Sequence, residues 1–117
     1  MFWNNKEAAV YLYTGILDMR VGIDRLSQLI KEQCNRSIIS GGWYVFFSRM
    51  RERVRIIYWD RDGYALWTKR LEAGSFKVEK GLNGYEEIAA VDLEEILNGV
   101  EFSRIKLRKQ AEKGLFS

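Results

Sequence analysis

The sequence lacks histidine and proline altogether and contains a single cysteine, Cys34. Without histidine the chain has no Ser-His or Cys-His nucleophile pair, and it lacks the commonest general base and metal ligand of proteins. One cysteine excludes a disulfide within the chain and a cysteine-built zinc site, and it fits a reducing compartment. The absence of proline removes one sign of a rigid linker between domains.

Long apolar runs are also missing. No apolar stretch approaches the ~18 residues of a membrane span, and no basic segment followed by an apolar one begins the chain, as a secretory signal would. We therefore expect a cytoplasmic protein without a membrane partner. The chain has 117 residues, of which 47% are hydrophobic and 30% charged, and this is enough for one folded domain that needs no metal or disulfide.

The charge is distributed unevenly along the chain. Residues 43–80 carry nine basic and five acidic side chains, and residues 81–103 carry six acidic and no basic ones. Residues 104–117 carry five basic and one acidic. Such asymmetry would steer a polyanion toward one face of the protein. The alternative is that these charges simply solvate the surface.

The pattern of apolar residues predicts mainly strands. Residues of high β-propensity fall at 8–14, 43–48, 54–59, 64–71, 75–78 and 85–91, the last being a strand or an extended lead-in. Apolar residues at helical spacing predict a helix over 22–33, and Asp92 is expected to be the N-cap of a second helix. This order predicts an α+β fold, with an antiparallel sheet of about five strands and two or three helices mainly on one face. We assign 1–103 to a single domain and 104–117 to a basic C-terminal tail or frayed helix.

The Asp60-Arg61-Asp62-Gly63 turn sets the expected register of the central hairpin. A three-residue loop, Arg61 to Gly63, with Gly63 in the left-handed conformation, would place Asp60 opposite Tyr64. The core face would then carry Val54, Ile56, Tyr58, Tyr64 and Leu66, and the other face Arg53, Arg55, Trp59, Trp67 and Lys69. A slip of one residue would exchange these sets.

The second of these faces mixes cations with aromatic rings, as surfaces that bind single-stranded nucleic acid do. In the structural alternative, Trp59 and Trp67 form a cross-strand pair covered by the Lys and Arg stems. The predicted nucleic-acid-binding residues are Arg20, Arg49, Arg51, Arg53, Arg55, Trp59, Trp67, Lys69 and Arg70.

The carboxylates form no convincing catalytic pattern. Asp18 and Asp24 are six residues apart and would not share a helical face, and Asp60 and Asp62 belong to a turn. Ser40-Gly41-Gly42 lacks the Lys-Ser/Thr of a phosphate-binding loop. We predict no enzyme activity, no catalytic residues, no metal site and no cofactor. The less favoured alternative is a nuclease whose metals are held by carboxylates from separate elements.

Three motifs, in order, carry a family resemblance: T-G-I-L-D-M-R-V-G-I-D at 14–24, R-I-I-Y-W-D at 55–60 and K-R-L-E-A-G-S-F at 69–76. From about Val10 to Phe102 the chain resembles the TnpB-like accessory proteins of the IS Sixty-Six group of bacterial insertion sequences. These proteins are encoded by the second open reading frame of the element. Arg55 replaces the family's usual Lys, and Val21 stands where a basic residue is common.

The resemblance implies a small accessory protein that acts in transposition beside a separate, larger transposase and has no assigned catalytic activity. DNA and that transposase are therefore the candidate partners. One interpretation is contact with nucleic acid through the basic hairpin. The alternative is a protein-interaction module that docks on the transposase or another subunit of the element through the acidic segment 86–101. In a structural alternative the motifs mainly maintain the fold, with Asp18 or Asp24 paired across the sheet to Arg20 or Arg55.

Overall fold

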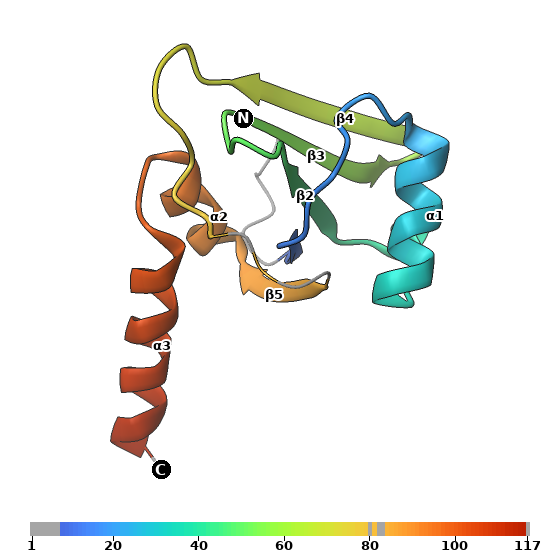
Figure 1. The fold of residues 1–117 in the computed structure, drawn as a ribbon. Helices are drawn as coiled ribbons and strands as arrows, with labels where there is room; N and C mark the ends of the chain where they lie inside the picture. The colour runs from blue at the N-terminus through green and yellow to red at the C-terminus, as the bar shows by residue number, and fades with distance from the viewer. Residues whose placement is uncertain (1–7, 80, 82–83, 117) are drawn as a thin grey trace.

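The computed structural model describes residues 8–79, 81 and 84–116. In this part of the chain five strands form one sheet in the order β4-β3-β2-β1-β5 (Figure 1). The strands are β1 (Ala9–Tyr13), β2 (Trp43–Phe47), β3 (Arg53–Asp60), β4 (Gly63–Arg70) and β5 (Tyr85–Ala89). The helices are α1 (Ile23–Cys34), the short 3-10 helix η1 (Ile38–Ser40), α2 (Ala90–Leu97) and α3 (Phe102–Phe116). The predicted α+β class, with about five strands, is confirmed.

The centre of the sheet is a parallel pair, unlike the rest of the sheet. Strand β1 pairs parallel with β2, with Val10 opposite Trp43 and Leu12 opposite Val45. The other edge of β1 pairs antiparallel with β5. On the far side of β2, the pairs β2–β3 and β3–β4 are also antiparallel. A parallel pair needs a crossover connection, and α1 supplies it between β1 and β2. The sheet is therefore mixed, where the prediction had it antiparallel throughout.

Both faces of the sheet are covered. Val10, Leu12 and Val45 pack in one buried cluster with residues of α2 and the first turn of α3. Tyr11 and Tyr44 pack in a second cluster with α1. Figure 1 shows α1 on one side of the molecule and α2 and α3 on the other. The helices thus divide between the two faces, although the prediction placed them mainly on one. Strand β2 is buried at every position, and its unbroken apolar run W-Y-V-F-F is typical of a strand with two covered faces.

Two local predictions differ from the structure. The segment 75–78 is not a strand, yet Phe76 and Val78 are buried in the core beside α2 and α3. Asp92 is not an N-cap, because α2 begins two residues earlier, at Ala90. Its carboxylate accepts a hydrogen bond of 2.9 Å from the backbone N–H of Ala89, so it still satisfies a free donor at the start of the helix.

The basic C-terminal segment forms helix α3, which extends away from the sheet (Figure 1). Its first turns contribute Phe102 and Ile105 to the core, and most later positions up to Lys113 are exposed. None of the helices in the described part of the chain combines the length and apolar character that a bilayer span requires.

Gly42 provides a test of the packing between β1 and β2. Its φ is +96°, and an added Cβ would lie 2.9 Å from Cε2 of Tyr11. The Tyr11 ring is stacked on Tyr44 and lies under the Arg36 guanidinium, so it cannot move aside. Gly42→Ala should lower the free energy of unfolding in urea by more than ~1 kcal/mol. Gly63→Ala, where a Cβ meets nothing within 4 Å, is the control and should change it by less than ~1 kcal/mol. Equal effects of the two substitutions would contradict this account.

Candidate nucleic-acid interface

The β3–β4 hairpin has a two-residue loop, Arg61 and Asp62, and this fixes its register. Asp60 lies opposite Gly63, and Trp59 lies opposite Tyr64. Arg61, with a φ of +57°, adopts the left-handed conformation that the prediction gave to Gly63. The predicted register, with Asp60 opposite Tyr64, is therefore wrong by one residue.

The changed register separates the aromatic residues of the predicted platform. Trp67 and Lys69 lie opposite Ile56 and Val54, on the face covered by α2 and α3. Trp59 stays on the face covered by α1, so it forms no pair with Trp67. Instead its ring meets that of Tyr64 edge to face, with centroids 5.2 Å apart. The indole Nε1 of Trp59 donates to the carbonyl of Arg61 at 3.0 Å, which ties the ring to the loop.

Arg51 is buried, with only 5% of its surface exposed. Its guanidinium donates to backbone carbonyls of Val78 at 3.0 Å and Thr14 at 3.1 Å, with longer bonds to Ser48 and Glu79. Its backbone is left-handed, with a φ of +57°. Burial lowers the pKa of the guanidinium, but arginine stays charged in proteins. Arg51 therefore joins the β2–β3 loop, the end of β1 and the segment 75–79, and it is not presented to a ligand.

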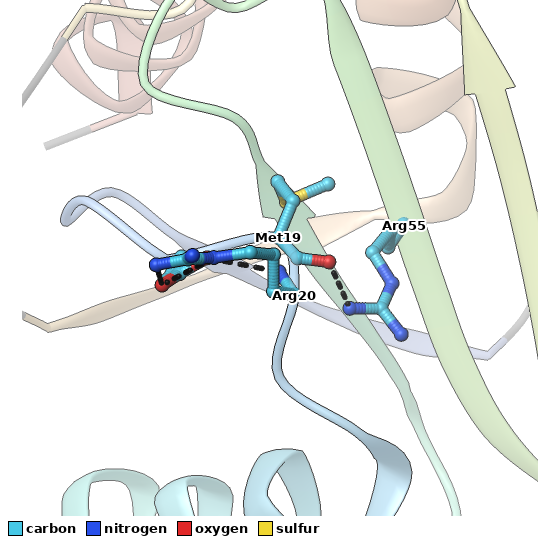
Figure 2. Close-up of polar contacts among 4 residues, drawn as sticks. Met19, Arg20 and Arg55 are labelled. Carbon is cyan, nitrogen blue, oxygen red and sulfur yellow. Dashed lines mark hydrogen bonds and ion pairs between the residues drawn. The ribbon is translucent and has the colours of Figure 1, made fainter.

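The side chain of Arg55 also bonds to the backbone of the protein itself. Its Nη1 donates to the carbonyls of Met19 at 3.2 Å and Val21 at 2.8 Å, and burial lowers its pKa. Figure 2 shows the Arg55 guanidinium directed at the Met19 carbonyl, while the Arg20 side chain points away from it. Arg55 thus fixes the loop that contains the D-M-R motif onto β3.

The D-M-R motif forms a local turn. The carboxylate of Asp18 accepts from the backbone N–H of Arg20 at 2.9 Å and from its guanidinium at 2.8 to 3.2 Å. The hydrogen bonds from Arg20 lower the pKa of Asp18 from 3.8 to about 2. Asp18 therefore pairs with Arg20 within one turn, whereas the structural alternative had such a pair crossing the sheet. Both side chains are exposed, and that leaves Arg20 accessible from solvent.

Arg53 and Arg70 lie directly opposite each other on β3 and β4, and both are exposed. Like charges in this arrangement destabilise a sheet. Arg70 has one weak ion pair, 3.6 Å from the exposed Glu72, and the Arg53 side chain has no ion pair among the described residues. The pair is thus two cations on an edge hairpin with little compensation from the protein itself.

On β4, every second residue beside this pair shares its face. We call this set the basic hairpin surface: Arg53, Arg70, Thr68, Leu66 and Tyr64. Tyr64 and Leu66 were predicted to be core but are 39% and 38% exposed. Sequence reasoning missed them because the register was wrong. The signal available was the turn, since a two-residue loop moves both residues to this face.

The remaining predicted cations lie elsewhere. Arg49 is exposed in the loop between β2 and β3, and Lys69 is exposed on the opposite face of β4. Within the described residues, no three Cys, Asp or Glu side chains lie close enough together to hold a metal ion. What the structure brings together is a charged, partly apolar sheet surface.

Arg51 yields a prediction about stability. Arg51→Ala would leave the buried carbonyl of Val78 without a donor and would remove one of the two donors to the carbonyls of Thr14 and Ser48. The free energy of unfolding should therefore fall by about 2 kcal/mol or more. Arg51→Lys should restore little of it, because an ammonium cannot reproduce the planar set of donors. The measurement is urea unfolding followed by circular dichroism. The control Arg49→Ala, at an exposed neighbour, should stay within ~0.5 kcal/mol of the parent. A similar small loss for Arg51→Ala would show that the carbonyls find other donors.

Asp18 yields a prediction about pH. Because its pKa is lower in the folded protein, the Asp18–Arg20 interaction stabilises the fold above about pH 4 and is lost as the pH falls toward 2. In Arg20→Gln the pKa of Asp18 should rise toward 3.8, since the guanidinium bonds are gone. NMR titration of the Asp18 carboxyl carbon measures this. Arg25→Gln, in the neighbouring helix, should leave the pKa at about 2. An unchanged value in Arg20→Gln would contradict the assigned cause.

Comparison with known proteins identifies the family. A family model described as "IS66 Orf2 like protein" matches residues 8–107. Two proteins of Sinorhizobium fredii (strain NBRC 101917 / NGR234), uncharacterized protein y4hO and uncharacterized protein y4jC, are each 28% identical to the chain. The alignments cover 87% of this chain and 89% of y4hO, and 83% of this chain and of y4jC. No solved structure matches. The match supports an accessory role in an insertion sequence, and the family is not a known catalytic one. The chain belongs to the IS66 Orf2 like protein family.

Proposed function

We propose that this chain is a non-catalytic accessory protein of insertion-sequence transposition, and that it contacts nucleic acid through the basic hairpin surface. The single observation that carries the proposal is the exposed Arg53–Arg70 pair. Two cations placed opposite each other weaken the hairpin, and a phosphate between them would turn repulsion into two favourable charge-assisted hydrogen bonds.

The same face of β4 also carries an aromatic side chain. Tyr64, six residues before Arg70 and so ~20 Å from it along the strand, presents a partly exposed ring, and Trp59 packs edge to face against it. An exposed aromatic ring on the face that carries backbone-binding cations suits an unpaired base of a strand that spans both, because every base has a face that can stack. Single-stranded DNA is therefore the form that this surface fits best.

The proposal gives the nine predicted residues different roles. Arg53 and Arg70 would contact phosphates, with Arg20 and Arg49 as outlying cations. Arg51 and Arg55 hold the loops beneath, as their bonds to carbonyls indicate. Trp59 would act by supporting Tyr64. Trp67 and Lys69, on the opposite face, would lie outside the contact.

The alternative, docking through the acidic segment 86–101, has a weaker basis in the structure. Three acidic groups there are already paired with cations of α3: Glu86 with Lys106, Glu95 with Arg108 and Asp92 with Lys109. A basic partner would have to displace these intramolecular pairs. The acidic segment is therefore better described as the site that holds α3.

The nucleic-acid proposal predicts salt-dependent binding that depends on the pair. Short labelled single-stranded DNA should bind, and the slope of log K against log salt should fall by about 0.7 for each phosphate contact removed. Arg53→Ala/Arg70→Ala should therefore weaken binding and lower the slope by about 1.4. Fluorescence anisotropy across a salt series measures both quantities.

The matched control removes the same charge from the segment after β4 and from α3, outside the basic hairpin surface. Lys77 and Lys113 are exposed, and Lys77→Ala/Lys113→Ala should change affinity far less than the arginine pair. Equal losses in the two double variants would mean that only net charge matters. No binding at low salt would remove the proposal. Duplex DNA bound as tightly as the single strand would contradict the role given to Tyr64.

A further inference from the structure

A second surface lies on the other side of the sheet, where α2 turns into α3. Residues from the end of α2, the connecting turn and α3 line a cleft of about 400 Å³: Glu95, Val100, Arg104, Leu107 and Arg108. Leu107 is 65% exposed, and with Val100 it supplies the aliphatic part of this lining. This cleft is separate from the basic hairpin surface, since α2 and α3 cover the opposite face of the sheet.

The spacing on α3 places two cations close to the exposed leucine. Leu107 and Arg108 follow Arg104 by three and four residues, so both are its neighbours on the helix surface. Phe102 and Ile105 are buried in the core. The side of α3 that carries Leu107 therefore combines an apolar centre with a cationic rim.

The two arginines of the rim differ in whether they already form an ion pair. The Arg108 guanidinium pairs with Glu95, and its side chain is still 57% exposed. Arg104 is exposed and has no ion pair among the described residues. Lys106 and Lys109 are paired with Glu86 and Asp92, so those ion pairs hold α3 in place while Arg104 stays available.

We infer that this cleft is a docking site for an acidic, amphipathic protein segment: one that inserts a bulky apolar side chain between Val100 and Leu107 and places a carboxylate on Arg104. The aliphatic lining favours a protein side chain over a nucleic-acid base, which would stack on aromatic rings. A second copy of this chain is disfavoured, because it would present the same cationic α3. The acidic segment 86–101 alone would attract a basic partner, whereas this cleft would bind an acidic one.

The test uses a labelled model peptide with Leu at every third or fourth position and Glu or Asp elsewhere, added to the full chain. Saturable shifts of the Val100 and Leu107 methyl signals are expected, with none at Leu66 on the other face. Binding should weaken at least ten-fold in Leu107→Ser and in Arg104→Glu. The controls are Ile39→Ser, which also replaces an exposed apolar residue, and Lys113→Glu, with the same change of charge on the same helix. Both controls should bind like the parent.

Several results would overturn the inference. These are an absence of methyl shifts, equal binding of an all-Glu peptide without leucines, or unchanged affinity in Leu107→Ser. A single-stranded DNA that shifts the same methyl groups and competes with the peptide would assign the cleft to nucleic acid instead. Loss of DNA binding in the Arg53 and Arg70 variants has no bearing on these outcomes, so the two proposals fail independently.

Discussion

The buried guanidinium of Arg51 is the constraint on which the arrangement of the loops depends. A cation with many donors sits among carbonyls from three parts of the chain, and no carboxylate among the described residues forms an ion pair with it. Because one guanidinium donates to carbonyls in all three, it ties the β2–β3 loop, the end of β1 and the segment after β4 to one another. Phe76 also donates its backbone N–H to the Arg51 carbonyl at 2.7 Å. The irregular segment 71–79 is thereby tied to the β2–β3 loop, and it delivers Phe76 and Val78 to the core.

Along one short stretch, consecutive odd-numbered arginines take different roles. Arg51 is interior, Arg53 is exposed and Arg55 holds the loop of the D-M-R motif. The high positive charge of this segment therefore overstates the number of cations available to a ligand. The two family motifs, D-M-R and R-I-I-Y-W-D, meet through the bonds of Arg55 to backbone carbonyls, and this contact gives both a structural reason. Of these three arginines only Arg53 is exposed, and it lies opposite the exposed Arg70.

The parts of the fold that sequence could predict are those set by local periodicity. The helix over 22–33 and the strands near Trp43 and Val54 follow from spacing and β-propensity, and the structure has them within a residue or two. The hairpin register failed because a glycine was expected to take the left-handed position, which Arg61 occupies. The burial of Arg51 was invisible, since its partners are backbone carbonyls, which every residue has. The exposure of Tyr64 was missed because of the same one-residue error. The sequence therefore indicated the hairpin as the candidate surface, but it assigned some residues to the wrong face.

The position of β1 has a consequence for the order in which the chain can fold. The strand nearest the N-terminus lies between β2 and β5, so its two edges are completed by residues more than thirty and more than seventy positions later. During synthesis β1 can pair with β2 once α1 has formed, but one edge stays open until β5 leaves the ribosome. The acidic and basic segments that follow β5, joined by ion pairs, then close the same end of the sheet. A chain truncated before residue 85 would leave an apolar strand edge unprotected and prone to association with other chains.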